Sequence, residues 1–150
     1  MPKMIFVNLP VTDLARSTAF YEAIGGTINP LFSNEQATAI VLSDAIYVML
    51  LTHDFYRTFT KKDVIDAHRT SGVLLAISCD SKADVDAMID KAVSAGGKGD
   101  PGPKQEFGEL MYGRSFEDPD GHHWEPNWMA PQAIQGGAEA LTKAEAPAGK

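Results

Sequence analysis

Residues 116–129 read FEDPDGHHWEPNWM, which combines a turn with a strand. The DPDG tetrapeptide is typical of a tight turn, and a strand after it places alternate side chains on opposite faces. His123 and Glu125 then share one face, whereas Trp124 lies on the other. Two side chains do not hold a divalent metal ion, because catalytic sites generally take about three protein ligands plus water. A metal site here therefore needs further ligands from elsewhere in the chain.

The rest of the chain repeats one plan twice. A strand-like run, IFVNLPV, precedes a stretch with helical spacing of apolar residues that ends at a Gly-Gly pair, and further short strands follow. The same plan recurs roughly 70 residues later, from VLLAISC through a second helical stretch that also ends at Gly-Gly. Asp13 and Asp80 stand where the helices begin and are predicted to cap them. The sequence thus predicts an α+β fold of two strand-helix-strand-strand-strand units, residues 3–52 and 72–129, whose curved mixed sheets surround a cleft.

Two segments are predicted to lie outside these units. Residues 53–71 form a surface connection, with a short helix expected over residues 61–69. Aromatic residues of this connection are expected to pack against a second subunit or to cover the cleft mouth. They are Phe55, Tyr56 and Phe59. After a domain at residues 1–129, residues 130–150 contain few large apolar groups, which predicts a disordered tail.

Composition excludes several classes of partner. The chain carries 13 basic and 20 acidic side chains, a formal net charge of −7, which repels nucleic-acid phosphates and anionic membranes. Its apolar runs are too short for a membrane span or a secretory leader, and Cys79 has no second cysteine to pair with. We therefore expect a cytoplasmic protein that binds neither nucleic acid nor membranes.

Two motifs carry a resemblance to a known family. They are V-x-D-L-x-x-S-x-x-F-Y at residues 11–21 and D-P-D-G-x-x-x-E at residues 118–125. Together with the repeated plan, they make residues 4–129 similar to the vicinal oxygen chelate superfamily. That superfamily includes glyoxalase I, a lactoylglutathione lyase, as well as fosfomycin-resistance enzymes, bleomycin-resistance proteins and extradiol dioxygenases. The resemblance implies a metal ion in the cleft, held by residues from the first and last strands of each half.

Carried over onto this chain, the resemblance places the four metal ligands at Phe6, Leu50, Leu74 and Glu125. Only Glu125 is a residue type that binds zinc or nickel. The other three positions are expected to wall the cleft with apolar groups. We therefore expect no cofactor, with a divalent metal at Glu125 as the alternative.

Other polar residues are expected near Glu125. Asn8 and His123 each lie two residues from a cleft-facing position, so they should face the cleft as well. A metal cluster of Asn8, His123 and Glu125 is an alternative, although an amide oxygen is a poor ligand for zinc or nickel. Tyr112 and Arg114 belong to the neighbouring strand and are further candidates for ligand binding or for hydrogen bonds to Glu125. The pattern leaves open which face of that strand turns inward.

These residues predict a metal-free protein, similar to the bleomycin-resistance branch, that binds a small organic molecule in its cleft. The resemblance also implies a homodimer, because small members with two units per chain commonly pair. The alternative function is that of a lactoylglutathione lyase-like isomerase or lyase. Such an enzyme would act on a small oxygenated substrate, with Glu125 as base or metal ligand.

Overall fold

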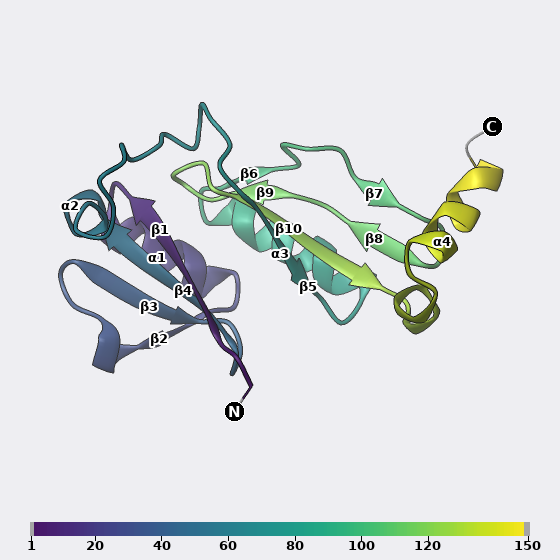
Figure 1. Ribbon diagram of the computed structural model, residues 1–150, viewed down its shortest axis with the longest axis horizontal. Helices are drawn as coiled ribbons and strands as arrows, with labels where there is room; N and C mark the ends of the chain where they lie inside the picture. The colour runs from purple at the N-terminus through teal and green to yellow at the C-terminus, as the bar shows by residue number, and fades with distance from the viewer. Residues whose placement is uncertain (1, 149–150) are drawn as a thin grey trace.

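The computed structural model describes residues 2–148, and in it each half of the chain forms one β-sheet with one helix against it (Figure 1). In the first half the strands follow the order β1-β4-β3-β2, with β1 parallel to β4. Its elements are β1 (Ile5–Val11), α1 (Leu14–Ala23), β2 (Thr27–Asn29), the 3-10 turn η1 (Pro30–Phe32), β3 (Ala37–Val41) and β4 (Ile46–Thr52).

The second half repeats this arrangement with its outer strands interrupted. β5 lies parallel to β10, and the other side of β10 pairs with β8 and β9, which in turn pair with β7 and β6. Its elements are β5 (Leu74–Ser78), α3 (Lys82–Ser94), β6 (Lys98–Gly99), β7 (Gln105–Glu106), β8 (Met111–Gly113), β9 (Phe116–Glu117) and β10 (His123–Met129). The predicted α+β fold of two strand-helix-strand-strand-strand units is confirmed.

Both halves contribute to one hydrophobic core between the helices and the sheets. The first half supplies residues such as Leu9, Phe20 and Leu50, and the second supplies Ile89 and Trp124. Burial of apolar surface stabilises a fold by about 25 cal/mol per Å², so this shared core helps to hold the halves together. The two units therefore share one core.

Of the two predicted helix caps, the structure confirms the one in the first half. Asp13 accepts a hydrogen bond from the backbone N–H of Arg16 and caps α1 as predicted. The prediction for Asp80 is wrong, since Ser81 caps α3 by accepting from the N–H of Asp84. A serine oxygen one residue later reaches the same free N–H groups.

The connection and the tail differ from their predicted forms. The helix expected over residues 61–69 is absent from the connection, which instead begins with the single turn α2 (His53–Tyr56) and then runs without regular structure to β5 (Figure 1). Where a disordered tail was predicted, Pro131–Ala148 form the kinked helix α4, although residues 149–150 lie outside the described residues. Ile134 of this helix is 65% exposed. The helix therefore adds little apolar burial.

None of the helices within residues 2–148 is both long enough and apolar enough to cross a membrane.

Candidate functional site

The face of the first sheet that turns away from its helix, here called its open face, is set by the pairing of β1 with β4. Phe6 lies opposite Tyr47 and Asn8 opposite Met49, whereas Leu50 is fully buried on the helix face. The prediction that Leu50 lines the cleft is therefore wrong. Met49 takes that place, because a shift of one residue turns a strand position to the opposite face.

An apolar pocket occupies the open face of the first sheet. The rings of Phe6 and Tyr47 stack at 4.8 Å between centroids with an interplanar angle of 12°. The pocket has a volume of about 430 Å³. We call it the aromatic pocket, and its lining is Met4, Phe6, Asn29, Phe32, Ala39, Tyr47 and Met49. Of the predicted cleft residues, it contains Phe6 only.

The open face of the second sheet carries the polar candidates. β10 pairs with β5 so that His123 lies opposite Leu74 and Glu125 opposite Ala76. The Nε2 atom of His123 lies 3.1 Å from Oε2 of Glu125, within hydrogen-bond distance, and both side chains are partly buried. Glu125 also lines a hollow of about 240 Å³ beside Met111. We call this hollow the Glu125 pocket. The sequence correctly predicts that Leu74, His123 and Glu125 share a face.

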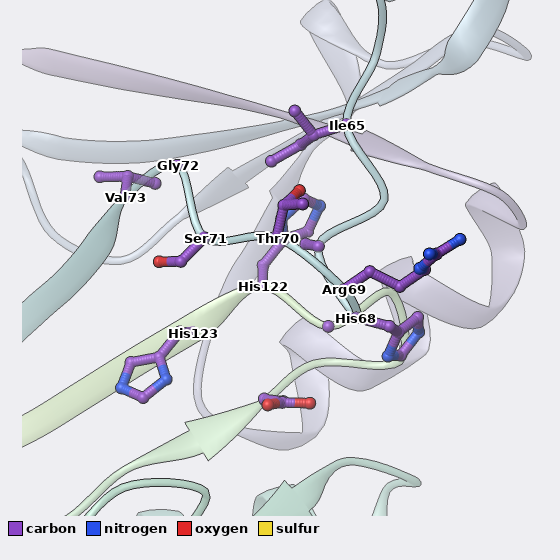
Figure 2. Close-up of a pocket in the computed structure, with 12 residues that line it drawn as sticks. Ile65, His68, Arg69, Thr70, Ser71, Gly72, Val73, His122 and His123 are labelled. Atoms are coloured by element: carbon purple, nitrogen blue, oxygen red, sulfur yellow. The ribbon is translucent and has the colours of Figure 1, made fainter.

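His123 also lines a second hollow, of about 200 Å³, beneath the connection between the halves. Figure 2 shows its ring below Ser71, with the side chain of Arg69 pointing away from it. The same hollow contains His68, whose Nε2 lies 3.1 Å from the carbonyl oxygen of Pro119. His123 therefore stands between this hollow and Glu125, a position that strand alternation alone does not reveal.

Tyr112 and Arg114 turn toward the helix rather than toward Glu125. The Tyr112 hydroxyl donates to Asp86 of α3 at 2.6 Å, and the Arg114 guanidinium donates to Asp86 and Asp100 at 2.9 and 2.6 Å. Hydrogen bonds from Tyr112 and Arg114 lower the pKa of Asp86, and the bond from Arg114 lowers that of Asp100. Arg114 borders the Glu125 pocket, but its charge is balanced by the two aspartates.

The turn before β10 docks onto the start of α1 through two buried carboxylates. Asp120 accepts hydrogen bonds from the N–H and hydroxyl of Thr12 at 3.0 and 2.8 Å, and from the hydroxyl of Ser17 at 3.2 Å. Asp118 accepts from the hydroxyl of Tyr21 at 2.6 Å, and the indole of Trp124 donates to the same hydroxyl. The two sequence motifs are thus joined by direct contacts.

Burial explains the protonation behaviour of this docking network. It raises the pKa of Asp118, and the hydrogen bonds and the nearby His122 offset that effect only in part. Burial also raises the pKa of Tyr21 well above its ordinary value, and the adjacent Asp118 adds to the effect. Each of these groups has a hydrogen-bond partner inside the protein, so the network holds the two halves together.

The residues at the implied metal positions do not fit a metal ion. Phe6, Met49 and Leu74 stand there with Glu125, and three of these four side chains have no ligand suited to zinc or nickel. Within residues 2–148, no three His, Cys, Asp or Glu side chains are grouped so that they could hold an ion. Asn8 lies on the first sheet, where its amide donates to the Phe6 carbonyl at 3.2 Å. It does not join His123 and Glu125.

The fold and the two joined motifs agree with one known family. The model of the glyoxalase/bleomycin resistance protein/dioxygenase superfamily matches residues 3–125. The chain belongs to that superfamily. None of the curated proteins with which it was compared matches it.

Solved structures of similar proteins support the fold. A hypothetical protein from S. aureus, SA1046, is 25% identical with a TM-score of 0.69, covering 85% of this chain and 95% of its own. A family enzyme from Burkholderia phytofirmans PsJN is 18% identical with a TM-score of 0.67, covering 86% and 100%. The fosfomycin resistance protein FosX from Mesorhizobium loti is 17% identical with a TM-score of 0.64, covering 90% and 98%.

Proposed function

We propose that this superfamily member binds a small organic molecule on the open faces of its two sheets, without a metal ion. The observation that carries the proposal is the lining of those faces. Apolar side chains stand at three of the four positions where the superfamily resemblance implies metal ligands, and on the second sheet Glu125 and His123 supply polar groups beside Leu74. A mostly apolar hollow with a small number of polar groups is typical of small-molecule sites.

Metal content gives a direct test. Elemental analysis of the purified protein is expected to find no stoichiometric transition metal, because one carboxylate and one imidazole do not complete a zinc or nickel site. Added zinc or nickel is likewise expected not to produce isomerase activity toward the glutathione adduct of methylglyoxal. One ion per chain that is lost in a Glu125→Gln variant would contradict the proposal.

We further propose that a second copy of the chain completes the site. β1 pairs only with β4 and β5 only with β10, so each leaves one unpaired edge among the described strands. Apolar side chains at these edges are about half exposed, with Ile5 at 57% and Leu74 at 57%. Exposed apolar edge strands favour pairing with another chain. A two-fold pair that sets β1 beside the partner's β5 would bring the aromatic pocket of one copy to the Glu125 face of the other.

Light scattering tests this assembly. The parent is expected to show twice the mass of one chain, and an Ile5→Asp, Leu74→Asp double variant is expected to show the mass of one, because both edges would then carry a charge. Phe59→Asp is the matched control, since Phe59 is 68% exposed but packs on Phe55 within the connection. A parent that stays monomeric at tens of micromolar would contradict the dimer. Dissociation by Phe59→Asp alone would instead place the interface at residues 53–60.

Acid–base catalysis on a small oxygenated substrate is the second candidate function. The hydrogen-bonded His123–Glu125 pair favours it, because a carboxylate that orients an imidazole prepares the other ring nitrogen to accept a proton. Substrate hydrogen exchange in D₂O separates the two candidates. Exchange by the parent that disappears in Glu125→Gln would support catalysis, whereas binding without exchange would support a binding protein.

A further inference from the structure

The aromatic pocket is chemically unlike the other hollows of the molecule. The polar groups of its lining are the Asn29 amide and the Tyr47 hydroxyl, which donates to the Asp44 carbonyl at 3.0 Å, and no charged side chain lines it. The hollow beneath the connection contains Glu117 and Arg69, and the pocket on the second sheet contains Glu125 and Arg114. The aromatic pocket is therefore suited to a ligand group that carries no charge, since a charge on that group would lose its hydration without gaining a partner from the lining.

The rings within the pocket define the shape of that group. Phe6 and Tyr47 lie nearly parallel, and Phe6 is 50% exposed. A third flat ring can extend this stack, because aromatic rings prefer offset parallel or edge-to-face contacts at centroid distances of about 4.5 to 7 Å. Phe32, which is 68% exposed on η1, supplies another apolar wall.

The volume and the polar groups of the aromatic pocket restrict the class of ligand further. A volume of about 430 Å³ lies at the lower end of the range for small-molecule sites and suits about two rings. Asn29 Oδ1 already accepts from the N–H of Leu31 at 3.1 Å, so its amide N–H₂ is the group that can donate to a ligand acceptor. The net charge of −7 additionally opposes anions.

We propose that the aromatic pocket binds a flat, uncharged aromatic group of about two rings, which stacks on Phe6 and Tyr47 and presents at most one hydrogen-bond acceptor to Asn29. This inference rests on the proposed function, of which it names the ligand class. A small ligand is favoured over a side chain from a partner protein, because Phe6 and Tyr47 line a hollow. The most protruding apolar group nearby, Leu31 at 87% exposure, stands outside the lining.

A matched pair of fluorescent probes tests the ligand class. N-phenyl-1-naphthylamine and its 8-sulfonate both carry a two-ring naphthalene, the group expected to stack, with a phenylamino substituent. They differ by one negative charge, and both become brighter in apolar surroundings. The neutral probe is expected to bind the full-length protein saturably, with a Kd at least about tenfold lower than that of the sulfonate. Equal binding, or tighter binding of the sulfonate, would overturn the inference.

Four variants locate the bound probe. Phe6→Ala and Tyr47→Ala are each expected to weaken binding of the neutral probe about tenfold, whereas Tyr47→Phe should keep the stack and the affinity. Leu31→Ala is the matched control, because Leu31 lies next to Phe32 but outside the lining, and its affinity should stay within about twofold of the parent. Unchanged melting temperatures would show that the losses arise at the pocket.

The remaining outcomes separate this inference from the proposed function. If Met111→Ala abolishes binding while Phe6→Ala does not, the ligand lies in the Glu125 pocket, so the inference fails and the proposed function stands. If the neutral probe binds only the Ile5→Asp, Leu74→Asp variant, a second copy fills the aromatic pocket and the inference fails. If the neutral probe does not bind at all, the inference fails, and the metal analysis still decides the proposed function.

Discussion

Replacing Asp118 with alanine is expected to lower the free energy of unfolding by about 3 to 5 kcal/mol. The buried carboxylate accepts from the Tyr21 hydroxyl at 2.6 Å and from the backbone N–H groups of Asp120 and His122, each at 2.9 Å. Alanine leaves these three donors without an acceptor, and each unsatisfied buried donor costs about 1 to 3 kcal/mol. Asp118 is 2% exposed, so water cannot replace it in the folded chain without a local opening.

Urea unfolding followed by circular dichroism measures this loss. Asp13→Ala is the matched control, because Asp13 is an exposed aspartate that also accepts a backbone hydrogen bond, and loss of such a cap typically costs about 1 kcal/mol. If both substitutions cost the same, the turn before β10 does not dock the two halves as described.

The pH dependence of that loss follows from the shifted pKa of Asp118. Because burial raises its pKa in the folded state, the folded chain holds this proton more tightly than the unfolded chain does. The resulting stabilisation is fully present below the unfolded pKa of about 3.9 and is lost as the pH rises through the folded pKa. The difference between parent and Asp118→Ala should thus be larger near about pH 4 than near about pH 7. Asp86 and Asp100 have lowered pKa values, so they make the free energy of unfolding rise with pH. They do so in the parent and in the variant alike.

The sequence predicts the fold because helical and strand periodicities alternate twice and end at recognisable glycines. It does not predict which face of β4 turns inward, since the run AIYVMLLT is apolar at nearly every position and lacks the alternation that marks a half-buried strand. The resemblance places Leu50 in the cleft, and no alternation in this run corrects that register. β10 alternates polar and apolar residues, and there the predicted facing of His123 and Glu125 agrees with the structure.

The aromatic pocket escapes sequence analysis for a related reason. Phe6 and Tyr47 meet only because β1 and β4 are parallel neighbours in one register, and no local pattern defines the register between strands 41 residues apart. Phe32 belongs to a run that reads as a strand, yet Asn29 caps a 3-10 turn there by accepting from the N–H of Leu31. Tertiary pairing thus decides the composition of the pocket.

Trp124→Ala is expected to cost about 3 to 5 kcal/mol of unfolding free energy. Its ring is 4% exposed, lies parallel to Phe116 at 6.4 Å between centroids, and meets Tyr21 edge-on at 6.1 Å. Removing it leaves a cavity in the shared core and takes the indole donor from the Tyr21 hydroxyl. The polar contact of Trp124 is with the first helix, through the Tyr21 hydroxyl.

Trp128→Ala is the matched control within the same strand. Trp128 is partly exposed and faces the ammonium group of Lys82 at 5.7 Å, so its loss is expected to cost about 1 to 2 kcal/mol. Thermal unfolding of both variants measures the difference.

A double-mutant cycle then tests whether Trp124 acts through Tyr21. Trp124→Ala and Tyr21→Phe should show a coupling of about 0.5 to 3 kcal/mol, because both substitutions break the same indole–hydroxyl bond. Trp124 also lies between His123 and Glu125 on β10, so its burial turns their side chains to the open face. Additive losses would show that the tryptophan stabilises the core without the hydrogen bond. In that case packing against Phe116 and Tyr21 alone would hold β10, and with it His123 and Glu125, in place.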